Sequence, residues 1–325
     1  MRIDPALWAM RTNDEAQRQA QHAMVEAAAA WRQQSCWRDV AAGIRVFGEG
    51  AGLAQCPALV TLFAPDGAGQ KLARAFVEHF LTVLAREPLA QVPSRYAANG
   101  SVMTLMLAAS GRATLSLVLF DGARLAERPA PQSAGFAQGE RRELVIAGCG
   151  EGRLVERVHS HGPLSSRLLH FQPGQILDID TARQALLVER VDGAMVTLRL
   201  MRTAQEPGPS LEYALSDGRL VHQSAGTIGE SAQELMLALL GRMKRADAVP
   251  LMARMSGEGG ESLRWQALRE CLALDSGAGF RALCAIAADP GDVLAAPAGA
   301  LRAQLLEAYP VLAGMLEAED MPCPA

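Results

Sequence analysis

The stretch from Leu168 to Arg202 constrains the fold of this chain more than any other. It holds three short runs of apolar residues, separated by the turn signals Pro173-Gly174 and Asp192-Gly193. Its isoleucines, leucines, valines and methionines suit a pleated, half-buried surface. Asp-Gly between two such runs favours a β-hairpin, because a type I′ turn needs positive φ at both central residues. The stretch therefore predicts the centre of an antiparallel β domain.

Similar runs and turns extend the predicted β domain over residues 101–226. We predict hairpins at Ser110-Gly111, around Gly148–Gly152 and at Asp217-Gly218, with a polar loop over 129–139. Strands at such regular spacing, with polar turns between them, are typical of a barrel or a sandwich.

Helical patterns precede this region. Residues 12–42 are predicted to be helical, with Thr12 and Glu15 as a capping box and Gly43 as the stop. Residues 70–86 carry apolar side chains at helical spacing, whereas residues 59–63 are predicted to form a strand.

Helical patterns return after Thr227. Helices are predicted over 231–243, 262–274, 280–288 and 299–309, and their rhythm faintly resembles a pair of HEAT-type helical hairpins. The side chains expected in the core of this region are Trp265, Leu268, Leu272, Phe280 and Leu283.

The predicted fold class is therefore α+β. An N-terminal helical or mixed segment covers residues 1–100, an antiparallel β barrel or sandwich covers 101–226, and a helical region covers 227–325. With 325 residues, half of them hydrophobic, the chain can bury a sizeable core.

The composition argues against several classes of function. The formal net charge is -4 and no block of Lys and Arg stands out, so nucleic acid is not expected as a partner. The six cysteines contain no C-x-x-C, which argues against a zinc ribbon or a redox motif. No secretory signal or membrane-spanning run is recognised, so we expect a cytoplasmic protein of bacterial type that does not bind a membrane.

Histidines in the β region are candidate metal ligands. His159 and His161 are two residues apart, so they would share one face of a strand. His170, His222 or a carboxylate would complete the site with them. Against this, Gly162-Pro163 follows at once and places His161 near a turn, where the pair would face solvent.

The central stretch also resembles the first conserved motif of cupins, over about residues 168–202. A Pro-Gly turn at Pro173-Gly174 precedes a short apolar run, and a second run ends at Gly193. The resemblance implies a cupin-like β fold. Asp178 and Asp180 stand where the family has its metal-binding H-x-H pair, and Ala185 or a neighbour stands where it has a Glu. The family's usual metal site would then be lost or rebuilt.

Asp178 and Asp180 share one strand face and allow two interpretations. Two close carboxylates can divide their pKa values for acid–base work, or bind a hard cation. Charged residues are seldom buried, however, so we expect the pair on the solvent face. Motifs for a catalytic nucleophile are absent from the sequence.

The sequence allows two functions. The first is a ligand-binding or scaffolding protein with a degenerate cupin-like domain, with no cofactor, and with a small molecule, another protein or a second copy of itself as partner. Its candidate ligand-binding residues are Asp178, Asp180, His170 and His222. The alternative is a metal-dependent oxygenase or isomerase of cupin type, holding iron or zinc through His159, His161, His170 and His222. Convergence of these ligands on one site would favour the enzyme, and we expect that they do not converge.

Overall fold

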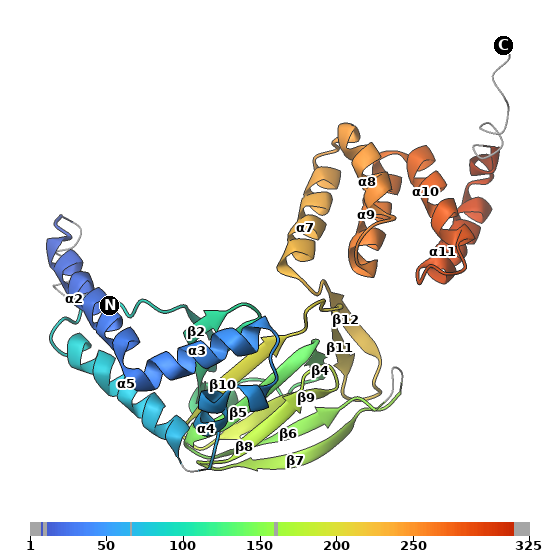
Figure 1. Ribbon diagram of the computed structural model, residues 1–325. Helices are drawn as coiled ribbons and strands as arrows, with labels where there is room; N and C mark the ends of the chain where they lie inside the picture. The colour runs from blue at the N-terminus through green and yellow to red at the C-terminus, as the bar shows by residue number, and fades with distance from the viewer. Residues whose placement is uncertain (1–7, 9–11, 66, 159–161, 315–325) are drawn as a thin grey trace. The chain divides into compact units, whose positions relative to one another are not determined.

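The computed structural model describes residue 8 and residues 12–65, 67–158 and 162–314. It divides into two compact units (Figure 1). The first holds the chain up to Glu206 together with Tyr213–Arg219, and the second holds Pro207–Glu212 and the chain from Leu220 onward.

The first unit is built around two antiparallel sheets. The larger has the order β1-β2-β3-β10-β5-β8 and the smaller the order β7-β6-β9. The strands of the larger sheet are β1 (Tyr96–Asn99), β2 (Val102–Ser110), β3 (Ala113–Asp121), β5 (Gly139–Ala147), β8 (Ile176–Asp180) and β10 (Ala194–Thr203). Those of the smaller sheet are β6 (Gly150–Glu156), β7 (Ser165–Phe171) and β9 (Gln184–Val191).

A hydrophobic core joins these two sheets face to face. Alternate residues of β3, β5 and β10 point inward, among them Val118, Val145 and Met195, which are all buried. From the smaller sheet, Leu154 and Phe171 pack against them. The predicted α+β class is confirmed, and of the two predicted architectures the sandwich is the one observed, because the sheets do not close into a barrel.

The N-terminal helices cover the other face of the larger sheet (Figure 1). Leu115, Leu144 and Leu198 pack there against aromatic and aliphatic side chains of the helices. The close packing explains Gly69, where an added Cβ would lie 2.4 Å from Leu144 Cδ2. The helices are α2 (Glu15–Gln33), α3 (Ser35–Glu49), α4 (Pro57–Leu62) and α5 (Ala68–Leu84).

Four predictions for the N-terminal segment were wrong: the single helix, its capping box, its end at Gly43 and the strand over 59–63. The helix over 12–42 is two helices that break at Gln34, and α2 begins after Asp14 without a side-chain cap. Helix α3 runs through Gly43, which packs against Leu59, and ends at Gly50 with φ of 123°. Residues 59–63 lie in and directly after α4, because Pro57 begins a helix whose Leu59 and Leu62 both face the core.

Two predicted hairpins were also wrong. The turn at Gly148–Gly152 joins β5 to β6, and the turn at Asp192-Gly193 joins β9 to β10. In both cases the two strands belong to opposite sheets. A turn signal in the sequence indicates only that the chain changes direction. At both of these turns the chain passes from one sheet of the sandwich to the other. The hairpin at Ser110-Gly111 is confirmed, with β2 paired to β3 and Gly111 at φ of 53°.

A third sheet, of order β12-β11-β4, contains the hairpin predicted at Asp217-Gly218. Its strands are β4 (Ser133–Phe136), β11 (Ser210–Ala214) and β12 (Leu220–Ser224). Gly218 has φ of 71°, as the turn requires, and Ala214 N donates a hydrogen bond to Arg219 O at 2.8 Å.

The second unit is helical after Thr227. The Thr227 side chain caps its first helix by accepting a hydrogen bond from Glu230 N, and the Asp275 side chain caps α10 through Ala278 N. Of the side chains predicted for its core, Leu268, Phe280 and Leu283 are fully buried, and Trp265 and Leu272 pack half-buried against them. The helices are α7 (Ile228–Arg242), α8 (Val249–Met255), α9 (Glu261–Leu274), α10 (Ser276–Ala288) and α11 (Ala295–Ala308).

Candidate functional site

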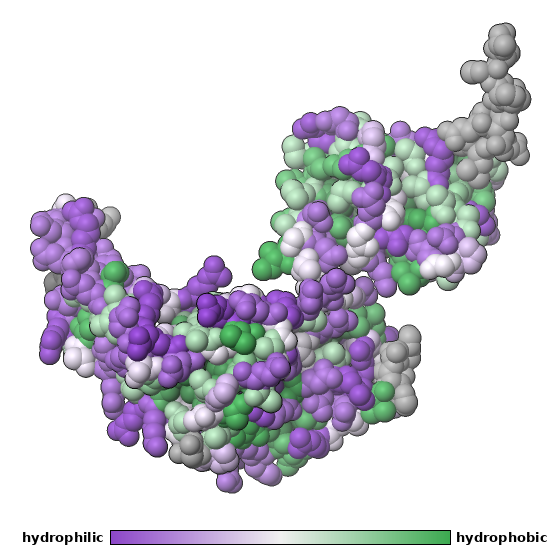
Figure 2. Space-filling model, in the orientation of Figure 1, coloured by the Kyte–Doolittle hydropathy of each residue, from purple (hydrophilic) through white to green (hydrophobic). Residues whose placement is uncertain are grey.

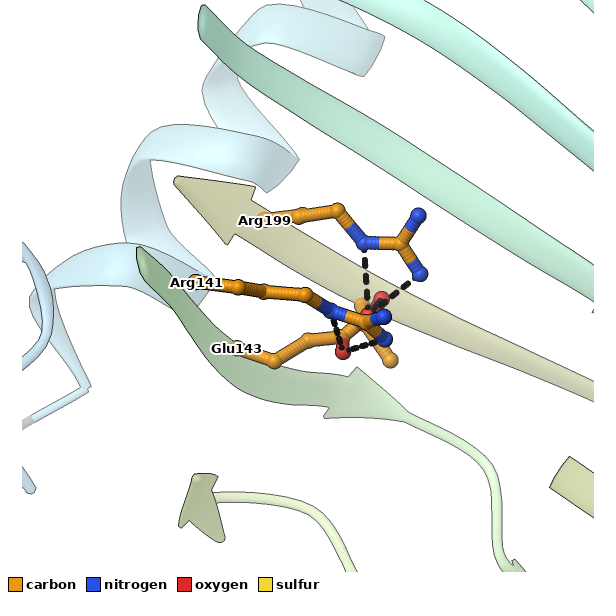
Figure 3. A network of polar contacts seen from close by, with 4 residues as sticks. Arg141, Glu143 and Arg199 are labelled. Atoms are coloured by element: carbon orange, nitrogen blue, oxygen red, sulfur yellow. Dashed lines mark hydrogen bonds and ion pairs between the residues drawn. The ribbon is translucent and has the colours of Figure 1, made fainter. Parts of the chain in front are cut away.

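A charged cluster lies inside the sandwich, on the inward face of the larger sheet. Strands β5 and β10 are neighbours, and their register places Glu143 directly opposite Arg199. Because side chains alternate along a strand, Arg141 and Glu143 share the inward face of β5 with the core residue Val145. Thr197 precedes Arg199 by two residues and points the same way. Figure 3 shows the side chains of Arg141 and Arg199 converging on the Glu143 carboxylate.

Both carboxylate oxygens of Glu143 accept several hydrogen bonds. Its Oε1 accepts hydrogen bonds from Arg199 Nε at 3.0 Å, Arg199 Nη2 at 2.8 Å and Thr197 Oγ1 at 2.9 Å. Its Oε2 accepts one from Arg141 Nε at 2.8 Å and another from Arg141 Nη2. Charge-assisted bonds of this fork geometry are stronger than neutral ones, so the carboxylate holds both arginines in fixed orientations.

Burial and charge act in opposite directions on this cluster. The side chain of Glu143 is 2% exposed, and those of Arg141 and Arg199 are 15% and 18% exposed. Burial alone would raise the pKa of Glu143, but the two guanidinium groups outweigh it and hold that pKa below its usual range. Burial lowers the pKa of Arg141, against the attraction of Glu143. A guanidinium stays charged in proteins, so the cluster carries one excess positive charge.

The stability of the protein should depend on the ionisation of Glu143. A carboxyl group whose pKa is lower in the folded than in the unfolded protein stabilises the fold above the unfolded pKa, about 4.3 for Glu. That contribution is lost as the pH falls toward the folded pKa. In urea unfolding at pH 7, 5, 4 and 3.5, we expect wild type to lose more free energy of unfolding below pH 4.5 than Glu143→Gln. Equal losses in both proteins would show that Glu143 does not titrate with folding.

The cluster forms one wall of a cavity of about 630 Å³. Arg141 and Arg199 line it from the larger sheet, and Leu186 and Val188 line it from β9 of the smaller sheet. The rim is the segment 125–131, which begins within the short helix α6 (Gly122–Ala126) and includes the lining residue Arg128. A volume of this size falls in the range of small-molecule sites.

The charge around this cavity is positive. Glu189 is its one acidic lining residue among those the structure describes, and Arg153, outside the lining, donates to it from Nε at 2.7 Å. Arg128 donates to the hydroxyl of the buried Ser101 at 3.1 Å and meets no carboxylate within the described residues. Arg128 and the excess charge of the Glu143 cluster therefore face the cavity uncompensated.

Both buried arginines keep donors that Glu143 does not use. Each binds the carboxylate through Nε and Nη2, and no described residue accepts a hydrogen bond from Nη1 of Arg141 or Arg199. Because a guanidinium has five N–H donors in a rigid plane, one edge can hold Glu143 while the other remains available to a bound anion.

The predicted aspartates lie elsewhere, on the edge strand β8. Arg142 donates to both oxygens of Asp178, at 2.5 and 2.6 Å, and the Asp178 side chain is 63% exposed. Asp180 is exposed and accepts a hydrogen bond from Ala182 N at 3.0 Å. The two line a second cavity of about 450 Å³ on the helix-covered side of the sheet. Their carboxylates are thus engaged in local structure.

The two predicted histidines that the structure describes, His170 and His222, are not gathered with these aspartates. His170 is exposed on β7, with Nδ1 at 3.5 Å from Glu151 Oε1, and His222 is exposed on β12 in the second unit. His159 and His161 lie outside the described residues. Within the part of the chain that the structure describes, no three His, Cys, Asp or Glu side chains are grouped as metal ligands. Of the predicted metal ligands, the four that the structure describes, His170, His222, Asp178 and Asp180, therefore do not form such a group.

Sequence reasoning missed Arg141, Glu143 and Arg199. A signal exists for Arg199, which stands between Leu198 and Leu200 in the apolar run of β10, whereas Arg141 and Glu143 fall in the run of four charged residues 140–143 and carry no such signal. Leu144 and Leu198 fill the helix-covered face, while the charged residues alternate with them on the other face. A charged residue inside an apolar strand that is buried on both sides, such as Arg199, indicates a paired charge inside a sandwich.

Over the described residues, no helix has both the length and the hydrophobicity to cross a bilayer. Neither a protein-family model nor a curated protein matches the sequence.

Solved structures resemble about a third of the chain. The 7S globulin of Momordica charantia is 11% identical, with 37% of this chain and 35% of that chain aligned and a TM-score of 0.27. A cupin superfamily protein of Desulfitobacterium hafniense is 16% identical, with 33% and 83% aligned and a TM-score of 0.24. An RmlC-like cupin of Shewanella frigidimarina is 13% identical, with 35% and 87% aligned and a TM-score of 0.24.

The aligned part spans only about a third of the globulin and of the vicilins of Solanum melongena and Capsicum annuum. No comparison shows a HEAT-type repeat in the helical region. The proteins of Desulfitobacterium hafniense and Shewanella frigidimarina are described as cupins, and TM-scores of this size carry no statement about the fold, ligand or activity of this chain.

Proposed function

We propose that the β sandwich binds a small anionic molecule, bearing a carboxylate or phosphate group, in the cavity formed by Arg128, Arg141 and Arg199. The observation that carries the proposal is that two positive charges inside the sandwich share one negative charge. Two guanidinium groups share the single carboxylate of Glu143 at the wall of a cavity of about 630 Å³. An anion would supply the missing negative charge.

The cost of burying charge supports this interpretation. A buried cation without a counter-ion is unfavourable, so excess positive charge in a partly enclosed site favours a ligand of opposite sign. Planar guanidinium groups match carboxylate and phosphate oxygens in pairs of hydrogen bonds. The apolar side chains Leu186, Val188 and Phe120 would contact the rest of the ligand.

The proposal assigns binding and no reaction. It replaces Asp178, Asp180, His170 and His222 as the proposed ligand-binding residues, because these side chains do not line the charged cavity. A cytoplasmic location is proposed with it, supported by the free thiols of Cys36, Cys56, Cys149, Cys271 and Cys284.

A thermal-shift series tests the proposal. Citrate and inorganic phosphate should raise the Tm of the wild type above that in sodium chloride of equal ionic strength, because a ligand that binds only the folded state stabilises it. Saturation at about 100 times Kd would correspond to about 2.7 kcal/mol. Arg128→Gln should reduce the shift.

Arg124→Gln is the matched control. Arg124 lies on α6 beside the same rim, but its partner is Asp121 and it does not line the cavity. Its Tm shift should equal that of the wild type. Failure of both anions to raise the Tm above the chloride series, or equal loss in both variants, would refute the proposal.

A further inference from the structure

Helix α7 presents an exposed apolar face along its whole length. Ile228 is 91% exposed, Leu235 71%, Leu239 54% and Met243, directly after the helix, 55%. Isolated apolar residues on a surface are ordinary, but a contiguous stripe of large ones indicates a site of contact. Helix α7 forms one edge of the helical unit in Figure 1, and Figure 2 shows hydrophobic residues at that edge.

The stripe is separate from the core of its own unit. Successive members follow at spacings of seven and four residues, which places them on one side of a helix. The opposite side packs against α8 and α9, where Leu237 is 2% exposed and Leu240 is half-buried. Helix α7 is therefore apolar on two opposite sides, and only one of them is covered within the second unit.

The stripe is self-complementary under a two-fold rotation. If two copies of α7 pair antiparallel about the midpoint between Leu235 and Met236, Ile228 faces Met243 and Ala232 faces Leu239. Each apolar position then meets an apolar position of the partner, as a contact between identical surfaces requires. Met236, 54% exposed, meets Leu235 at the centre.

Charges at the two ends of the stripe match in the same arrangement. The turn before α9 lies beside the first turn of α7, because Gly260 N donates to Glu230 Oε1 at 3.2 Å, and it carries the exposed Glu258 and Glu261. Arg242 and Lys244 are exposed at the other end. The described residues give none of these four an ion-pair partner. An antiparallel pair places the acidic end of each copy beside the basic end of the other.

We propose that this α7 stripe, Ile228, Leu235, Met236, Leu239 and Met243, is the contact surface for a second copy of this chain. Two antiparallel α7 helices form the centre of a symmetric dimer, with Glu258 and Glu261 of one copy near Arg242 and Lys244 of the other. A helix of 15 residues is about 22 Å long. An interface of that length falls at the small end for specific complexes, so the dimer is reversible and depends on concentration.

Sedimentation equilibrium of the full chain over a range of concentrations tests the proposal. Wild type should move from monomer to dimer. Leu239→Glu places two charges in the symmetric interface and should weaken association by about 100-fold or more. Val293→Glu makes a similar change at a 65%-exposed apolar residue away from α7, and it should dimerise like the wild type. Far-UV circular dichroism checks that each variant is folded.

Charge reversal gives a readout that a purely structural effect would not reproduce. Arg242→Glu with Lys244→Glu should weaken the dimer, and adding Glu258→Arg and Glu261→Arg should restore it. A wild type that stays monomeric at all concentrations would overturn the proposal, as would a Leu239→Glu dimer of unchanged affinity. One further outcome would also overturn it. If the wild type is a monomer, and Leu239→Glu lowers the Tm while Val293→Glu does not, the stripe is covered by the same chain and not by a second copy.

Discussion

Replacing Glu143 with alanine is expected to lower the free energy of unfolding by about 3–5 kcal/mol, because removing one partner of a buried ion pair leaves charge uncompensated in the interior. Arg141 and Arg199 would then face each other at the cavity wall with no counter-ion, and the hydroxyl of Thr197 would lose its acceptor. Urea unfolding monitored by circular dichroism measures the loss.

Glu140→Ala is the matched control for this change. Glu140 lies three residues earlier on the same strand and pairs with Arg202, but its side chain is 49% exposed. Glu140 is half-exposed, and Arg202, 15% exposed, keeps its hydrogen bonds to Phe47 O and Ala51 O without it, so the control should lose no more than about 1 kcal/mol. If Glu143→Ala costs no more than Glu140→Ala, Glu143 is not the buried counter-ion of two arginines.

Leu268→Ala is expected to destabilise the helical unit by about 2–5 kcal/mol, through lost apolar burial and the cavity left behind. Leu268 is fully buried on α9 and packs in one cluster with Phe280 and Leu283. Val293→Ala, at a residue that is 65% exposed in the same unit, should change stability by no more than about 0.5 kcal/mol. An unchanged Tm for Leu268→Ala would show that this face of α9 does not pack.

The helices were largely predictable because their signal is local. Residues 70–86 were expected to be helical and α5 spans Ala68–Leu84, with Leu72, Phe76 and Phe80 buried at helical spacing. The short α4 was predicted as a strand, because six residues are too few for the two periods to be told apart.

The strands were predictable, but their pairing was not. Asp192-Gly193 is a turn, as expected, with Gly193 at φ of 72°, but Asp192 does not take the positive φ of a type I′ turn. The sequence around that turn is the same whether the next strand returns to the same sheet or crosses to the other one. Which partner β10 takes depends on β3 and β5, which lie more than 40 residues earlier. That information is not contained in the turn.

The candidate site was the least predictable part. Residue types typical of catalysis directed attention to His170, Asp178 and Asp180, which the structure places on exposed surfaces. The charged residues that do lie inside, Arg141, Glu143 and Arg199, belong to two strands far apart in sequence. Each alone resembles an ordinary surface charge, and only the register of β5 with β10 shows that the two arginines share one carboxylate.

The proposal that the sandwich holds an anion is tested most directly by calorimetric titration of citrate into the wild type, Arg128→Gln and Arg124→Gln at low ionic strength. Loss of one charge-assisted contact of about 1.5–3 kcal/mol corresponds to at least a tenfold weaker affinity. We predict binding of one citrate per chain to the wild type and to Arg124→Gln, and at least tenfold weaker binding to Arg128→Gln. Equal affinity in all three proteins, or no binding heat in the wild type for citrate and phosphate alike, would contradict it.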